Sequence, residues 1–173
     1  FVNVSKKRRT EPREVVKLHM KNTTLCYLER GGKYLMLHRV KKENDINKDK
    51  WIGVGGKAEE GESPDECALR EVFEETGYVM ESWRCRGVVT FISDGDSEYM
   101  YVFTCDRFSG AEKVCDEGDL AWIDRDRITG LTIWEGDRIF LRLLRENAPF
   151  FLLKLTYSGD SLVSAVLDGK RIK

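Results

Sequence analysis

The chain has 173 residues and a formal net charge of −1, so it is long enough for one domain with a sizeable core and too close to neutral for general binding of polyanions. Its five cysteines include no CxxC spacing, and no apolar run approaches the length needed to cross a bilayer. We therefore expect no disulfide framework, zinc site, membrane span or signal peptide, and a cytoplasmic location in which the thiols stay reduced.

The N-terminal segment is polar and basic, with Lys6-Lys7-Arg8-Arg9 in a row. A terminal charge run of this kind is typical of a solvated tail, and a nucleic-acid contact is the alternative interpretation. We predict a tail over residues 1–14, a single domain over residues 15–173, and no stable nucleic-acid partner.

The segments that follow have the composition of strands. Residues 24–30 and 33–39 flank Gly31-Gly32 and predict a hairpin, and residues 51–54 predict a short strand that leads into a glycine-rich loop. The connection over residues 40–50 is long and charged, which is typical of a loop beside a binding site.

A helix is predicted after this loop, over residues 64–76. Ser63 and Glu66 form a capping-box pattern, Pro64 takes the first helical position, and Gly77 supplies a left-handed stop. At about 100° per residue, one arc of this helix is expected to face the core. That arc comprises Ala68, Leu69, Val72, Phe73 and Thr76.

A second arc of the same helix carries Glu71, Glu74 and Glu75, with Arg70 beside them. Carboxylates three and four residues apart repel one another by roughly 0.2–0.5 kcal/mol per exposed pair, so this arc favours a positive partner. A hard divalent cation with oxygen ligands is one candidate, and a simple solvated acidic face is the alternative.

Beyond the helix, the pattern alternates between further strands and a second helix. Strands are predicted over residues 83–92, 98–105, 120–123, 150–157 and 162–167. The second helix is predicted over residues 136–146, with Ile139, Phe140, Leu143 and Leu144 as its buried stripe. Mixed strands with two helices predict an α+β sandwich whose sheet is covered on both faces.

The glycine loop and first helix together carry a specific spacing. Gly56, Glu62 and the run from Arg70 to Tyr78 match the pattern Gx5Ex7REUxEExGU of the Nudix box, in which U is a bulky apolar residue and Tyr78 is an aromatic variant. On these residues the chain resembles Nudix hydrolases, which implies an α/β/α sandwich with the box as loop–helix–loop. The resemblance also implies Mg²⁺ as the cofactor, with Mn²⁺ as the alternative ion.

The same resemblance assigns roles to the residues of the box. It makes Glu71, Glu74 and Glu75 metal ligands together with the carbonyl of Gly55, and it makes Glu71 or another glutamate the general base. Arg70 would orient Glu71 through charge-assisted hydrogen bonds, and Glu62 would brace the loop. A surface ion-pair network is the alternative interpretation of these side chains.

Relatives in this family also use an acidic residue on a loop well after the box. We assign that role to Glu117, which lies just upstream of the predicted strand 120–123, with a solvated loop acid as the alternative. Arg39 and Lys57 are candidate phosphate contacts, although a single surface cation is as often only solvated.

Two further stretches bear on the substrate. Residues 51–57 (WIGVGGK) and 134–137 (WEGD) resemble the MutT-type hydrolases of oxidised purine nucleotides, with a closer likeness to the mammalian-type 8-oxo-dGTP diphosphatases. In that subgroup the tryptophan matched by Trp134 stacks on the base and the aspartate matched by Asp137 bonds its edge. Core packing of Trp134 and a helix-dipole role for Asp137 are the alternatives.

The chain departs from this subgroup at two positions. Ile52 stands where the mammalian-type proteins have an asparagine that contacts the base, and Gly136 stands where they have a second aspartate. The resemblance implies Mg²⁺-dependent hydrolysis of nucleoside triphosphates to monophosphate and pyrophosphate, with 8-oxo-dGTP as the first candidate. Dinucleoside polyphosphates, ADP-ribose and a non-catalytic nucleotide-sensing role are the alternatives.

Overall fold

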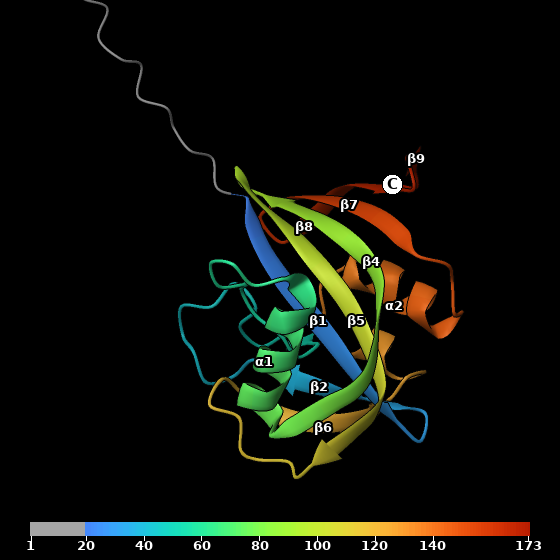
Figure 1. Cartoon of the computed structure of the whole chain (residues 1–173). Helices are drawn as coiled ribbons and strands as arrows, with labels where there is room; N and C mark the ends of the chain where they lie inside the picture. Colours follow the sequence, from blue (N-terminus) through green and yellow to red (C-terminus); the bar gives the residue numbers. More distant parts are fainter. Residues whose placement is uncertain (1–19) are drawn as a thin grey trace, which may run out of the picture.

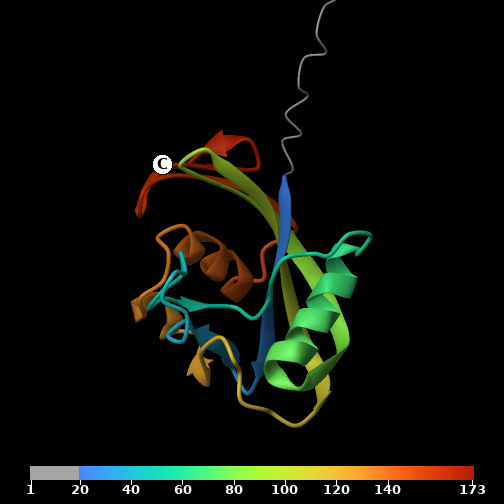
Figure 2. The ribbon, with the colours of Figure 1, turned by 90° about the vertical axis from the view of Figure 1, so that its left-hand side faces the viewer.

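A mixed sheet runs through the middle of the molecule, with one helix on each face (Figure 2). The computed structural model describes residues 20–173, so the predicted tail over residues 1–14 lies outside the described residues. The strand order is β3-β2-β1-β5-β4-β7-β8-β9, and β6 pairs with β2 (Figure 1). The arrangement is the predicted α+β sandwich with both faces of the sheet covered.

The elements follow the predicted order. The strands are β1 (Lys21–Arg30), β2 (Lys33–His38), β3 (Trp51–Ile52), β4 (Tyr78–Ser93), β5 (Asp96–Gly110), β6 (Asp119–Asp124), β7 (Phe151–Ser158), β8 (Ser161–Leu167) and β9 (Lys170–Arg171). The helices are α1 (Pro64–Thr76) and α2 (Asp137–Arg145), with a short 3₁₀ turn over Ile128–Gly130.

The predicted hairpin between β1 and β2 forms, but it is short. Only Glu29 with Tyr34 and Arg30 with Lys33 are aligned in antiparallel register. The rest of β1 runs parallel to β5, from Lys21 beside Glu98 to Leu28 beside Cys105. β1 can lie inside the sheet because Leu25, Cys26, Tyr27 and Leu28 are all buried, which is the pattern of a strand covered on both faces.

The first helix has the predicted bounds and caps. The Ser63 side chain and the Glu66 side chain make both hydrogen bonds of the capping box, and Gly77 ends the helix with a φ of 79°. The prediction that Phe73 faces the core is wrong, since this side chain is 54% exposed. The buried arc centres on Val72 and includes Glu75 instead of Phe73. At about 100° per residue, Glu75 and Phe73 lie on opposite sides of Val72.

The two faces of the sheet bury two separate clusters. On the α1 side, Cys26 and Leu28 of β1 pack with Val72, whereas on the α2 side Leu25 and Tyr27 pack in the cluster that contains Trp134 and Phe140. This separation follows from the alternation of side chains along a strand.

The second helix begins and ends one residue inside its predicted bounds. Phe140 and Leu144 are buried as predicted, Ile139 and Leu143 are partly buried against the same cluster, and Leu141 is buried in addition.

All five cysteines are free thiols, as predicted. In the part of the chain that the structure describes, no helix is long and apolar enough to cross a membrane.

Candidate active site

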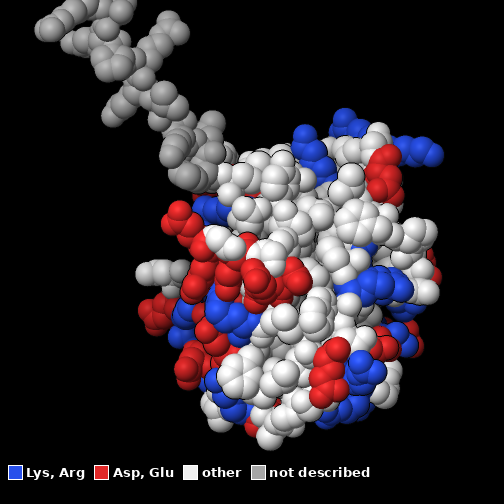
Figure 3. All heavy atoms as spheres, in the orientation of Figure 1, with Lys and Arg blue, Asp and Glu red and all other residues white. Residues whose placement is uncertain are grey.

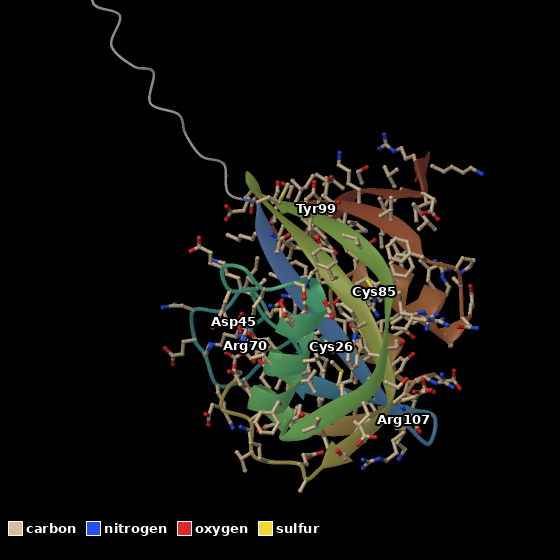
Figure 4. All side chains as sticks on the ribbon, viewed as in Figure 1. Cys26, Asp45, Arg70, Cys85, Tyr99 and Arg107 are labelled. Carbon is tan, nitrogen blue, oxygen red and sulfur yellow. The ribbon has the colours of Figure 1, made fainter. Side chains whose placement is uncertain are left out.

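Arg70 lies at the centre of the acidic arc of α1 (labelled in Figure 4). Its guanidinium donates two hydrogen bonds to Glu62, from Nε at 2.7 Å and from Nη2 at 2.9 Å. Nη1 donates to Glu71 at 2.7 Å and to Glu74 at 3.2 Å. The bonds from Arg70, with a further bond from the backbone N–H of Glu59, lower the pKa of Glu62 to about 2. Glu62 therefore remains ionised and connects the loop to the helix.

Glu71 is held against the glycine loop. Burial raises the pKa of its carboxyl group, and Arg70 partly offsets that rise. A Cβ atom at Gly56 would stand only 2.5 Å from Cδ of Glu71, so the missing side chain at Gly56 provides the space that the carboxylate occupies.

Glu75 lies deeper than the other two glutamates of the arc. It is 7% exposed, and its carboxylate accepts a hydrogen bond from the N–H of Gly55 at 3.2 Å. Burial raises the pKa of Glu75, and the nearby charges of Glu117 and Glu71 raise it further. The fold thus brings Gly55, Glu71, Glu75 and Glu117 together.

Glu117 reaches this cluster from the loop before β6. Its carboxylate accepts hydrogen bonds from Arg39 and Lys42. Burial acts to raise the pKa of Glu117, but the bond from Lys42 and the charge of Arg39 lower it overall. Glu117 is therefore the ionised member of the pair and Glu75 the member that retains a proton more readily.

Acidic side chains gather over the region of α1, with basic side chains among them (Figure 3). Among the described residues, no three acidic, histidine or cysteine side chains converge at metal-ligating distance, because Arg70 holds Glu71 and Glu74 while Arg39 and Lys42 hold Glu117. Oxygen donors are the ligands that a hard divalent cation prefers, so these carboxylates could hold one if they turned from their basic partners.

The two predicted phosphate contacts lie in different surroundings. Arg39 is paired with Glu117 and with Asp45 (labelled in Figure 4), to which its Nε donates at 2.6 Å. Lys57 is exposed, and its backbone carbonyl accepts a hydrogen bond from Arg70 at 3.2 Å. Arg39 thus faces the acidic cluster, whereas Lys57 is exposed.

Trp134 and Asp137, the two predicted base contacts, converge with Ile52 on one small cavity on the α2 side of the sheet. Its volume is about 80 Å³, and a neighbouring cavity of about 280 Å³ shares Ile46, Phe91 and Glu98 with it. The small cavity is lined by Leu25, Ile46, Asn47, Ile52, Phe91, Glu98, Met100, Trp134 and Asp137. The two cavities together reach the lower end of the range of about 300–1,000 Å³ that is usual for small-molecule sites.

Trp134 is fixed by the loop between β2 and β3. Its Nε1 donates a hydrogen bond to Asn47 at 2.7 Å, and the ammonium of Lys50 lies 4.2 Å from the centre of a Trp134 ring. The indole is mostly buried, as the core-packing interpretation requires, but it also lines the cavity.

Asp137 is buried in the first turn of α2 and borders the same cavity. Burial raises its pKa to about 7, against the opposing charges of Arg138 and Lys50. A carboxyl group that titrates near neutral pH can act as a hydrogen-bond donor or an acceptor.

Three polar residues of this region were not predicted from the sequence: Lys42, Asn47 and Glu98. Lys42 and Asn47 lie in the charged connection 40–50, which was singled out as a loop beside a site but not assigned residue by residue. Glu98 could have been found from the alternation along its strand, since Glu98, Met100 and Val102 share one face.

Known proteins resemble this chain over most of its length. The family model described as NUDIX domain matches residues 19–144. The uncharacterized Nudix hydrolase YvcI of Bacillus subtilis is 32% identical over 162 residues, which cover 90% of this chain and 99% of that one. The oxidized purine nucleoside triphosphate hydrolase of Danio rerio is 28% identical over 147 residues, covering 84% of this chain and 92% of that one.

Among solved structures, the crystal structure of the mutator MutT protein from Bacillus halodurans superposes with a TM-score of 0.77. It is 25% identical in sequence and covers 86% of this chain and 98% of its own.

Proposed function

Because the chain belongs to the Nudix family of hydrolases, we propose that it cleaves nucleoside triphosphates in a magnesium-dependent reaction to the monophosphate and pyrophosphate. We propose further that oxidised purine nucleotides such as 8-oxo-dGTP are its preferred substrates. The reaction would take place in the cytoplasm, where the five free thiols stay reduced.

The observation that carries this proposal is the short path between the cavity and the acidic cluster. Ile52 lines the cavity, and Gly55 lies against Glu75 only three residues later. An extended segment of that length spans about 10 Å, which is the scale of a nucleoside joined to its phosphates. A base between Trp134 and Asp137 would thus place its phosphate chain over the glutamates.

The residues of the cluster suit a cation that binds oxygen. Glu71, Glu74, Glu75 and Glu117, with the carbonyl of Gly55, would hold it. Burial and the charges of Glu117 and Glu71 raise the pKa of Glu75, so a bound cation would favour the ionised form of Glu75. When bound, Mg²⁺ supplies positive charge that stabilises phosphate oxygens and activates water.

The protein's own groups would then position and transfer protons. Arg70 fixes the Glu71 carboxylate, and Glu62 fixes Arg70 from the other side. Glu71 is half-buried with a raised pKa, so it is a better proton acceptor for an attacking water molecule than an ordinary glutamate. Arg39 lies beside Glu117 and is placed to contact a phosphate oxygen once the carboxylate turns away.

A panel of substrates tests this proposal. We would measure kcat/KM with Mg²⁺ for 8-oxo-dGTP, dGTP, the other triphosphates, ADP-ribose and a dinucleoside polyphosphate, and assay pyrophosphate and orthophosphate separately. We expect pyrophosphate as the product and the highest value for an oxidised purine triphosphate. A higher value for ADP-ribose or the dinucleoside polyphosphate would contradict the substrate class, and saturable binding without turnover would support a sensing role instead.

A further inference from the structure

Two carboxylates rather than one border the small cavity beside Trp134. Asp137 comes from α2, and Glu98 comes from β5 on the opposite wall. Glu98 also lines the neighbouring larger cavity, so it lies where the two join. No role in the acidic cluster around Arg70 accounts for a glutamate at this position.

The strand forces Glu98 toward the interior. Side chains alternate along β5, so Glu98 shares a face with Met100 and Val102, which are buried in the α2-side cluster. Tyr99 has the opposite parity and is exposed, near the turn that joins β5 to β4 (labelled in Figure 4). The Glu98 carboxylate is therefore half-buried at the edge of an apolar core.

The residues aligned with Glu98 do not neutralise it. Phe91 on β4 is apolar, and Lys21 on β1 makes its ion pair with Asp96, at 3.4 Å. Among the described residues, Glu98 makes no ion pair, and burial raises its pKa, although the charge of Lys21 and a hydrogen bond from the Thr23 side chain act to lower it. Thr23 offers this carboxylate one donor, which leaves its other lone pairs without partners among the described residues, so a ligand that supplies further hydrogen-bond donors would stabilise it.

We propose that Glu98 is a specificity-determining residue that accepts hydrogen bonds from N–H groups on the edge of the nucleotide base. This inference rests on the proposed function and adds the class of base to it. Guanine-type bases carry a ring N–H and an amino group side by side, and one carboxylate can accept from both. Adenine-type bases present an amino group beside an unprotonated ring nitrogen, whose lone pair a carboxylate repels.

Glu98 would also replace the polar groups that this chain lacks. Ile52 borders the cavity with an apolar side chain, and Gly136 has no side chain to offer. A Cβ atom at Gly136 would stand 2.4 Å from Leu155 and 2.7 Å from the Tyr157 hydroxyl, so a larger residue could not be added there without a shift of its neighbours. Glu98 on β5 instead offers its carboxylate as an acceptor to the same cavity.

The test compares base preference in Glu98→Gln with that of the wild type. We would measure kcat and KM for 8-oxo-dGTP, dGTP, dITP, which lacks the amino group, and dATP. We expect kcat/KM for the two guanine nucleotides to fall by at least about tenfold, mainly through KM, with little change for dATP. The advantage of dGTP over dITP should also disappear. Equal changes for all bases, or no change, would overturn the proposal.

Asp106→Asn is the matched control, because Asp106 is an exposed carboxylate on the same strand far from the cavity. Glu98→Asp keeps the acceptor on a shorter side chain and should preserve the preference for dGTP over dATP. If Glu98→Gln lowers the melting temperature sharply, the test uses Glu98→Asp instead. Loss of the preference for dGTP over dATP in a folded Glu98→Asp protein would overturn the proposal.

Binding measurements separate this inference from the proposed function. Affinities of the α,β-methylene analogues of dGTP, dITP and dATP would be determined for the same proteins. If the wild type cleaves no triphosphate, the proposed function fails, yet a guanine-selective loss of affinity in Glu98→Gln still supports the role of Glu98. A uniform loss, or a wild type that binds none of the analogues, overturns it.

Discussion

Individual glutamates of α1 differ in burial although they share one arc. Glu75 is buried and meets Gly55, whereas Glu74 is exposed and bonds only to Arg70. Both neutral variants, Glu74→Gln and Glu75→Gln, should lower kcat by at least about 100-fold, comparable to the loss of one key electrostatic group. Steady-state kinetics at saturating Mg²⁺ measure this, with Glu81→Gln, an exposed glutamate of β4, as the control. If either Glu74→Gln or Glu75→Gln retains its activity, the glutamate replaced in that variant is not a metal ligand.

Single residues show which features could be predicted from the sequence and which could not. Trp134 and Asp137 were predicted to act together, and the fold brings both to one cavity with Ile52. The placement of Phe73 in the core was wrong because the helical period defines an arc but not the direction in which the sheet lies. No motif marks Glu98. The alternation along β5 places it on the same face as Met100, but only the tertiary structure shows that this face borders the cavity with Trp134.

At the scale of elements, the glycine loop depends on how closely it approaches β1. The N–H of Thr24 donates to the carbonyl of Gly56 at 2.9 Å, and a Cβ atom at Gly55 would stand 2.0 Å from the carbonyl oxygen of Thr24. Gly55→Ala should therefore lower the free energy of unfolding by about 1–3 kcal/mol or more and displace the loop from Glu75. Urea denaturation and kcat/KM measure the two effects.

Gly130→Ala is the control for this variant. Gly130 lies in the 3₁₀ turn, and a Cβ atom there would meet no other heavy atom within 4 Å. It should leave both stability and activity close to those of the wild type. Equal effects of the two substitutions would show that the close approach at Gly55 is not what constrains the loop.

The elements themselves were largely predictable, but their pairing was not. The capping box and Gly77 gave the bounds of α1, because these signals lie within a few residues of the helix ends. The parallel pairing of β1 with β5 and of β4 with β7 joins segments that are distant in sequence. A parallel pair has no local turn to mark it, so the pattern of single strands cannot reveal its partner.

At the scale of the whole molecule, stability should depend on pH through Asp137. Its pKa is about 7 in the folded chain and ordinarily 3.8, so the folded state binds this proton more tightly than the unfolded state does. Stability should therefore fall as the pH rises from about 4 through 7. Asp137→Asn removes this dependence and should gain stability over the wild type across that range, by about 1.4 kcal/mol at most for each pH unit.

Urea denaturation of both proteins at several values between pH 4 and pH 8.5 measures the difference. Asp106→Asn, an exposed aspartate, should show a difference from the wild type that does not change with pH. A constant difference for Asp137→Asn as well would mean that Asp137 is ionised at all of these pH values in the folded protein.

The parallel seam between β1 and β5 has a consequence for how the chain folds. The hairpin of β4 and β5 closes locally around Asp94-Gly95. In contrast, β1 can pair with β5 only after the long segment between them has folded back, which aligns Lys21 with Glu98. Closing such a long loop lowers the chain entropy before the stabilising contacts form, so we expect refolding on the order of milliseconds to seconds. We expect the hairpin of β4 and β5 to form early and β1 to pair late.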